Sequence, residues 1–193
     1  MDVSDHRILS WWTMTGVPSE CSGRGPDATG RCWMIVTSPE NFELSAQRQF
    51  TLLGIKSRHR RKAERMRVGD LLVYYLIRQS VFAGACRIAS TMFEEHERIW
   101  YAPGKPDEDY PWRVNTEPLV MPPPEGRPTA DQLTERLTFV KKWPVEHWRL
   151  AFQGMVHDIP PADGRLILTA LCDAVPGPSG DLRAKDAGRC PAT

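Results

Sequence analysis

The chain has 193 residues, of which 41% are hydrophobic, so it is long enough for one domain with a buried core. Its formal net charge of +1 provides no overall attraction to a polyanion. No apolar run approaches the roughly 20 residues of a membrane-spanning helix, no secretory hydrophobic segment follows the first residues, and the five cysteines contain no C-x-x-C pair. We therefore expect a cytoplasmic protein with no membrane partner, disulfide framework or zinc knuckle.

The two ends of the chain have compositions that disfavour a packed core. Residues 1–31 include the stretch "CSGRGPDATG", and residues 175–193 are rich in Gly and Pro and contain no aromatic residue. Burial in such segments does not offset the entropy lost on ordering. We expect a flexible leader over 1–31, a folded domain over 32–174 and a disordered tail over 175–193.

The first half of the domain alternates short apolar runs with helix and turn signals. "CWMIVT" at 32–37 predicts a buried strand, and Ser38 followed by Pro39 predicts the N-cap and first position of a helix that runs to about Gln49. Further strands are expected at 71–77, after a Gly-Asp turn, and at 81–92, where Gly84 predicts a bulge or a close approach.

The second half contains one clearly alternating strand and two helices. Residues 112–117 place Trp112, Val114 and Thr116 on one face and polar residues on the other, which predicts a half-buried strand. Thr129 with Gln132 forms a capping-box signature. A final helix is expected after Pro160-Pro161, with one buried face made of Leu166, Ile167, Ala170 and Leu171.

These elements predict an α+β fold built on a small curled, barrel-like sheet with short helices at its edges. A doubly wound parallel sheet is disfavoured, because strands and helices do not alternate regularly and no G-x-G-x-x-G motif is present.

One segment concentrates positive charge. Residues 56–67 contain seven Lys and Arg against the single Glu64, a net charge of +6 in a chain whose total is +1. We call residues 56–67 the basic segment. Such a run is usually a solvated helix face, but here it also suggests phosphate contact, since the rest of the chain is slightly acidic.

The common catalytic and metal-binding motifs are missing from the sequence. It contains no P-loop, H-E-x-x-H or G-x-S-x-G, and no cofactor is expected. His96, His147 and His157 have no partner at ligand spacing, and the acidic pairs near 94–95 and 107–109 are expected to be solvated loop charges. Cys32, Cys86 and Cys172 lie in apolar patterns typical of inert buried thiols.

Seven tryptophans are many for this length. Each aromatic residue has a structural interpretation as part of the core or a covering loop. Their combination with Lys and Arg also suits nucleic acid, because aromatic rings stack on bases while the cations attract phosphates.

The order of five segments resembles that of an EVE domain of the PUA-like superfamily, closest to the single-domain prokaryotic type. The segments are "CWMIVTSPENFE", "GIKSRHRRKAERMRVGDLLVYYLI", "FAGACRIASTMFE", "YPWRVNTEPLVM" and "HWRLAFQGMVHDIPPADGRLIL", and the resemblance covers Cys32 to Ala174. It implies a pseudo-barrel of five or six strands flanked by short helices, on the plan shared with YTH and ASCH domains. It also implies a reader that takes a flipped, often modified base into a pocket.

Carried onto this chain, the resemblance implies two groups of site residues. The base pocket would be formed by Ser38, Asn41, Leu53, Gly54, Ile55, Trp100, Tyr101 and Trp148. The phosphates would be held by Lys56, Arg58, Arg60, Arg61 and Lys62. Leu53 is a departure, because the family commonly has a tryptophan there, and its loss argues against an aromatic cage of the YTH kind.

The function expected from the sequence is that of a monomeric reader of DNA or RNA that carries a modified base, with no catalysis of its own. An alternative is an ASCH-like enzyme acting on RNA or a nucleotide, for which His147, Glu146 and His59 are the available general bases. A second alternative is a protein interaction module whose aromatic residues form the interface.

Overall fold

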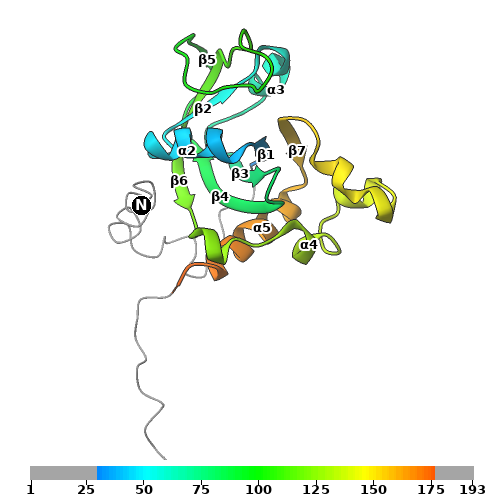
Figure 1. Cartoon of the computed structure of the whole chain (residues 1–193). Helices are drawn as coiled ribbons and strands as arrows, with labels where there is room; N and C mark the ends of the chain where they lie inside the picture. The colour runs from blue at the N-terminus through cyan, green and yellow to red at the C-terminus, as the bar shows by residue number, and fades with distance from the viewer. Residues whose placement is uncertain (1–29, 177–193) are drawn as a thin grey trace, which may run out of the picture.

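The structure is a computed structural model that describes residues 30–176. The expected leader and tail fall almost entirely outside these residues. The described part forms one curled mixed sheet with short helices around it, so the predicted α+β fold is confirmed (Figure 1). No helix within 30–176 has the length and apolar character needed to cross a membrane.

The elements are short. The strands are β1 (Cys32–Thr37), β2 (Leu52–Ile55), β3 (Leu71–Leu76), β4 (Val81–Ile88), β5 (Phe93–Glu94), β6 (Trp112–Val120) and β7 (Val156–Ile159). The α-helices are α2 (Pro39–Gln47), α3 (Arg60–Ala63), α4 (Ala130–Leu133) and α5 (Pro161–Asp173). The 3-10 turns are η2 (Ser57–His59), η3 (Pro124–Gly126), η4 (Val140–Lys142) and η5 (Val145–Phe152).

The sheet has the strand order β2-β6-β4-β3-β1-β7, with β5 paired to β6. β1 and β3 pair in parallel, and the other pairings among the described residues are antiparallel. The resemblance implied five or six strands, and the seventh is accounted for by β5, which has only two residues. β2 and β7, of four residues each, were not predicted from their residue pattern. Irregular pairing along β4 helps the sheet to curl.

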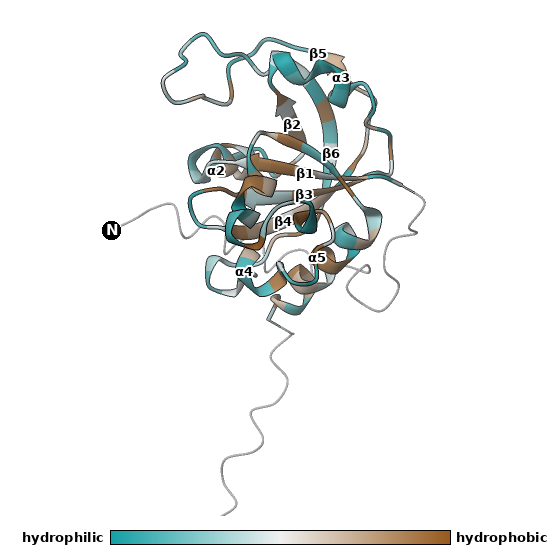
Figure 2. Cartoon of the chain, turned by 90° about the vertical axis from the view of Figure 1, so that its right-hand side faces the viewer, coloured by the Kyte–Doolittle hydropathy of each residue, from teal (hydrophilic) through white to brown (hydrophobic). Residues whose placement is uncertain are grey.

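Each face of the central strands packs into its own apolar cluster. Along β1, Trp33 and Ile35 face the cluster under α2, whereas Cys32, Met34 and Val36 face the cluster under α5. β3 divides in the same way, which explains its unbroken apolar sequence, because a strand covered on both faces needs no polar side. Figure 2 shows these strands in brown and α3 in teal, at the surface.

Most local predictions are confirmed. Ser38 caps α2 through the Asn41 N–H, and both hydrogen bonds of the capping box at Thr129 are present. Helix α2 ends at Gln47, two residues early, since Gln49 and Phe50 have positive φ angles of 55° and 52°. Gly84 is a close approach, because a Cβ there would overlap the Met121 sulfur.

Two burial predictions are wrong. Arg113 was expected on the polar face of its strand, yet its side chain is fully buried, because three oxygen acceptors neutralise and satisfy its guanidinium. The buried face of α5 contains Leu168 as well as Ile167 and Leu171, while Leu166 and Ala170 are only partly buried.

The "RVGD" turn that precedes β3 is organised by Asp70. Its buried carboxylate accepts the Trp33 indole N–H at 2.8 Å and the backbone N–H groups of Arg31 and Arg67, each at 3.0 Å. Gly69, with a φ of 91°, provides the left-handed turn that directs the carboxylate inward. This one side chain therefore joins the start of β1 to the end of the basic segment.

Candidate nucleic-acid interface

The candidate site is centred on Gly54, in the middle of β2. The indole of Trp100, from the long loop between β5 and β6, lies directly over this glycine, and a Cβ on Gly54 would overlap the ring carbons Cε3 and Cζ3. Trp100 is only 7% exposed. The Trp100 indole, expected to help form a base pocket, thus fills the space directly above Gly54.

The backbone of Gly54 faces the outer edge of the sheet. Thr116 donates its N–H to the Thr51 carbonyl at 2.9 Å, and the register pairs Leu53 with Val114 and Gly54 with Arg113. Because hydrogen-bonded and non-bonded pairs alternate along an antiparallel ladder, Leu53 bonds to β6 while the N–H and C=O of Gly54 point away from it.

No partner occupies this edge among residues 30–176. β2 is the terminal strand of the sheet, and the hydrogen bonds formed outside the strand ladders do not involve Gly54. A buried backbone donor and acceptor without a partner is uncommon, because leaving such groups unpaired costs free energy. The edge at Gly54 is thus a place where a planar polar ligand can supply the missing hydrogen bonds.

The Trp100 loop is held firmly by α2. The Trp100 indole N–H donates to the Ser45 hydroxyl at 2.9 Å. The Asn41 side chain donates to the Tyr101 carbonyl at 2.7 Å and accepts the Tyr101 N–H at 2.9 Å. Asn41 therefore uses its amide to fix the loop backbone, while the Tyr101 ring remains 64% exposed.

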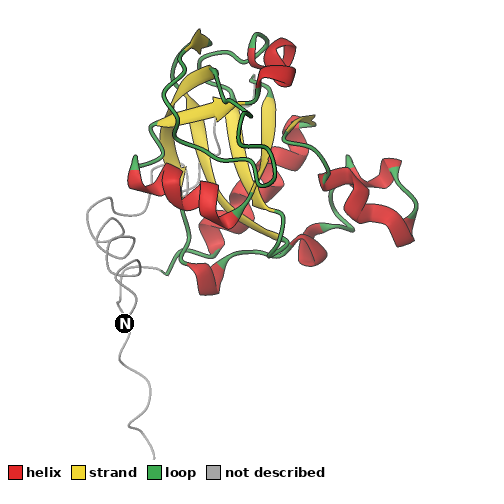
Figure 3. Ribbon diagram, turned by 45° about the horizontal axis from the view of Figure 1, so that its top comes forward, coloured by secondary structure: helices red, strands yellow, loops and turns green. Residues whose placement is uncertain are grey.

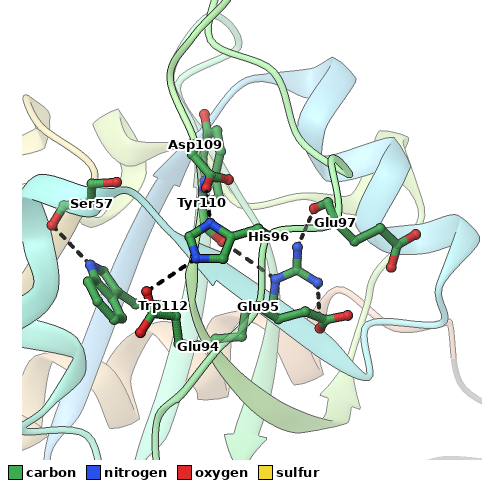
Figure 4. A network of polar contacts seen from close by, with 9 residues as sticks. Ser57, Glu94, Glu95, His96, Glu97, Asp109, Tyr110 and Trp112 are labelled. Carbon is green, nitrogen blue, oxygen red and sulfur yellow. Dashed lines mark hydrogen bonds and ion pairs between the residues drawn. The ribbon is translucent and has the colours of Figure 1, made fainter.

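Arg113, from β6, also holds the loop between β5 and β6. Its guanidinium pairs with the Glu95 carboxylate at 2.6 Å and also donates to the Glu97 carbonyl (Figure 4). The guanidinium carbon lies 5.6 Å from the Trp100 ring centre, where cation and ring attract each other. A fully buried cation thus connects both sides of the loop to the sheet.

The acidic residues near 94–95 and 107–109, which were expected to be solvated loop charges, form specific pairs instead. Asp109 and Glu94 bind the two ring nitrogens of His96 at 2.6 and 3.2 Å (Figure 4). The hydrogen bonds to Asp109 and Glu94 raise the pKa of His96. Glu108 lies 3.8 Å from both Lys56 and Arg58. Sequence spacing could not reveal these pairs, because Glu94 and His96 lie more than ten residues before Asp109, and Glu108 is about 50 residues from Lys56 and Arg58.

The basic segment folds into η2 and α3, directly after β2. Arg60 stacks over Trp112 at 4.7 Å and pairs with Glu64, and Arg65 pairs with Asp158 at 2.6 Å. Lys62 donates to the Val156 carbonyl. Arg61 is exposed, and no partner for its side chain is present among residues 30–176. The segment is thus partly neutralised but keeps cations available to solvent.

Two histidines adjoin these cations. Burial, followed by the charges of Arg58 and Lys62, lowers the pKa of His59, and burial followed by Lys62 lowers that of His157. His157 Nε2 is buried without a hydrogen-bond partner among the described residues. The lowered pKa values favour the neutral form of both rings.

The structure brings together most of the expected site residues but not all. Leu53, Gly54, Ile55, Asn41, Trp100 and Tyr101 lie around β2 and α2, and Ser38 caps the same helix. Trp148 lies in the other apolar cluster, edge-on to Phe152 at 5.7 Å, and is therefore separate from this group.

The two free thiols of the described residues are buried in the apolar clusters, Cys86 in the same cluster as Leu53 and Trp100. Cys32 and Cys86 are free and buried, and burial raises the pKa of each well above its ordinary value. Cys172 is not a free thiol, so the prediction of an inert thiol does not hold for it. Within 30–176, no three His, Cys, Asp or Glu side chains gather as metal ligands would.

A curled mixed sheet with a few short helices and an aromatic loop over its edge strand defines a PUA-like α+β domain. The sequence pattern described as "EVE domain" matches residues 31–170. The chain belongs to the EVE domain family, as the resemblance predicted.

Two archaeal proteins illustrate the sequence relationship. The chain is 24% identical over 148 residues to "UPF0310 protein PYRAB08750" of Pyrococcus abyssi, which covers 72% of this chain and 98% of the relative. It is also 24% identical over 145 residues to "UPF0310 protein PH1033" of Pyrococcus horikoshii, with coverage of 70% and 94%.

Solved YTH domains share the fold. The Zygosaccharomyces rouxii MRB1 domain, in complex with N6-methyladenosine RNA, superimposes with a TM-score of 0.54 at 18% identity, covering 76% of this chain and 89% of that domain. The Toxoplasma CPSF4-YTH domain in apo form also has a TM-score of 0.54 at 18% identity, with coverage of 83% and 95%. The Pho92 YTH domain in complex with m6A has a TM-score of 0.55 at 13% identity, with coverage of 76% and 88%.

Proposed function

We propose that this EVE domain is a nucleic-acid reader that holds one flipped, modified base against the outer edge of β2. The observation that carries the proposal is the Gly54 edge, where a backbone donor and acceptor lie side by side without a partner among the described residues. The polar edge of a nucleobase presents the complementary donors and acceptors.

The surroundings of Gly54 supply the rest of a reader. Extruding a base from its stack costs a few kcal/mol, which the site must recover. The exposed Tyr101 ring gives a stacking face on a backbone that Asn41 fixes, and the buried Trp100 forms a rigid wall beside it. The basic segment begins one residue after Ile55, so its free cations are available to hold the phosphates next to the base.

The family and the fold agree with this function. The MRB1 and Pho92 YTH structures carry N6-methyladenosine RNA or m6A by their descriptions, and this chain shares their architecture. Leu53 stands where the family commonly has a tryptophan, so we propose that edge hydrogen bonds contribute more to recognition here than a closed aromatic cage does.

A binding screen tests the proposal. Short DNA and RNA oligonucleotides carrying modified cytosine or adenine would be titrated by fluorescence anisotropy at two salt concentrations. We expect one modified base to bind at least about tenfold more tightly than its plain counterpart, and Tyr101→Ala to remove most of that preference, since one stacked base contributes about 1–3 kcal/mol. Tyr101→Phe keeps the ring and serves as the matched control. Equal affinity for every oligonucleotide would contradict the proposal.

The phosphate contact is tested separately by charge reversal. Arg61→Glu alters an exposed cation without a partner among residues 30–176, and Arg165→Glu makes the same charge change on α5, at the opposite end of the molecule in Figure 1. We expect Arg61→Glu to weaken binding of all oligonucleotides and to reduce the salt dependence, while Arg165→Glu leaves both nearly unchanged. The same effect from both variants would show that only overall charge matters.

A further inference from the structure

A second aromatic and basic surface lies away from Gly54. Residues 140–152, which we call the arm, comprise η4, η5 and the turn between them, and they project from the sheet beside β7 (Figure 3). Val140, Ala151 and Phe152 are buried and fix the two ends of the arm to the cluster under α5. The tip between these anchors is therefore held in place rather than attached loosely.

The tip exposes apolar and positively charged groups together. Trp143 is 43% exposed, and Lys141 and Lys142 directly before it are exposed as well. The Arg149 guanidinium stacks over Trp148 at 4.5 Å and pairs with Asp131 of α4 at 3.5 Å. Lys141 and Lys142 outnumber Glu146, the one acidic residue in 140–152. An exposed tryptophan flanked by cations is the combination that binds unpaired bases and their phosphates.

The arm is connected to the basic segment. The chain leaves the arm through Gln153 to Met155 and enters β7, where the Val156 carbonyl accepts the Lys62 ammonium of α3. In Figure 1, α3 lies above β7, and the arm lies on the far side of β7 from β2. A strand that places one base at Gly54 and runs along α3 would therefore have to continue past β7 to reach the arm.

We propose that the arm is a second contact for the same nucleic-acid strand, in which Trp143 stacks on an unpaired base beyond the basic segment and Lys141 and Lys142 hold the adjacent phosphates. This proposal rests on the proposed function. A protein partner would favour an apolar tip with few charges at its centre, whereas here two exposed lysines directly precede the exposed tryptophan, so the charge distribution favours a polyanion.

Single-stranded oligonucleotides of increasing length, with the preferred base at one end, test the inference. In the wild-type protein, affinity should rise as the strand becomes long enough to reach the arm. Trp143→Ala should lower the affinity for long oligonucleotides by about 5- to 100-fold, as for one lost base stack, and leave short ones unaffected. Trp143→Phe should restore most of the affinity. Val145→Ala, at a neighbouring residue that is 87% exposed, should change nothing.

The phosphate part of the proposal has its own signature. Lys141→Gln with Lys142→Gln should reduce the salt slope for long strands by about 1 to 2 units and leave the slope for short strands unchanged. If long and short strands respond alike to the Trp143 and Lys variants while Arg61→Glu still weakens both, the arm proposal is overturned and the proposed function stands. If the wild-type protein binds no oligonucleotide, the proposed function itself fails.

Discussion

At the scale of single residues, Asp70 shows how one carboxylate can determine a local fold. Its two oxygens accept three N–H groups, which come from β1, the residue before β1 and the end of the basic segment. Removing this side chain would leave one buried and two partly buried donors without an acceptor, and a buried unsatisfied group costs about 1–3 kcal/mol.

We therefore expect Asp70→Ala to lower the free energy of unfolding by about 3 kcal/mol or more. The free energy of unfolding is measured by urea titration with circular dichroism as the probe. The matched control is Asp107→Ala, in the exposed loop, which should change stability by less than about 0.5 kcal/mol. Similar losses for both variants would show that the Asp70 hydrogen bonds are not important to stability.

His157 gives a prediction about pH. Because burial and Lys62 lower its pKa in the folded protein below the unfolded value, the unfolded state binds more protons as the solution becomes acidic. Stability from this residue is present above pH 6.5 and is lost as pH falls towards the lower, folded-state pKa. His96, whose pKa is raised, acts in the opposite sense at an exposed position.

Replacing the His157 imidazole with a side chain that does not titrate isolates its pH-dependent contribution to stability. We expect wild-type stability to decline between pH 7 and pH 5.5, and His157→Gln to decline less over the same interval, as measured by urea unfolding at several pH values. His147→Gln, at an exposed position in the arm, is the control and should follow the wild type. An unchanged pH dependence in His157→Gln would contradict the assignment of the depressed pKa to that residue.

At the scale of elements, the loop between β5 and β6 determines the shape of the site. It has no regular structure of its own, yet α2, β6 and β2 each fix it through Asn41, Arg113 and Gly54. Arg113 binds a carboxylate and two carbonyls at once, which suits the planar guanidinium, since a lysine ammonium carries its three N–H donors on one nitrogen and cannot reach three separate acceptors in the same way.

Arg113→Lys should therefore loosen the loop while preserving the charge. We expect a loss of about 1–3 kcal/mol in unfolding free energy and faster hydrogen exchange of the backbone amides around Trp100 and Tyr101. Arg78→Lys, in an exposed pair with Glu40, is the control and should be nearly neutral. Unchanged exchange rates at Trp100 and Tyr101 in Arg113→Lys would show that the loop is held without Arg113.

The sequence predicted the elements whose signals are local. The helix starts at Ser38 and Thr129 and the buried strands β1 and β3 follow from capping residues and apolar runs a few residues long. It could not identify β2 as an edge strand or predict the burial of Arg113, because both depend on partners about 20 to 60 residues away in the chain. The candidate site residues were predicted mainly from the family resemblance. The structure explains why position 54 is a glycine, because a Cβ there would overlap the Trp100 ring.

At the scale of the whole molecule, the face of the sheet that packs against α5 stabilises the fold, and the proposed binding site lies at a different place, the edge strand β2. This face of the sheet packs against α5 through the apolar cluster under that helix. β2 lies at the end of the strand order, and its outer edge is unpaired among the described residues. Turn η2 and helix α3 follow β2 in the chain, so the basic segment begins beside that edge. The fold thus places a hydrogen-bonding edge and a group of cations together.

The central claim is that a base binds at the outer edge of β2. The most direct measurement is a two-dimensional amide NMR titration of the ¹⁵N-labelled protein with the oligonucleotide that binds best in the screen. We predict that the Gly54 amide and the Trp100 indole N–H shift and saturate together with the amides of the basic segment. If the basic segment shifts while the Gly54 and Trp100 signals stay in place, the strand binds elsewhere and the account is contradicted.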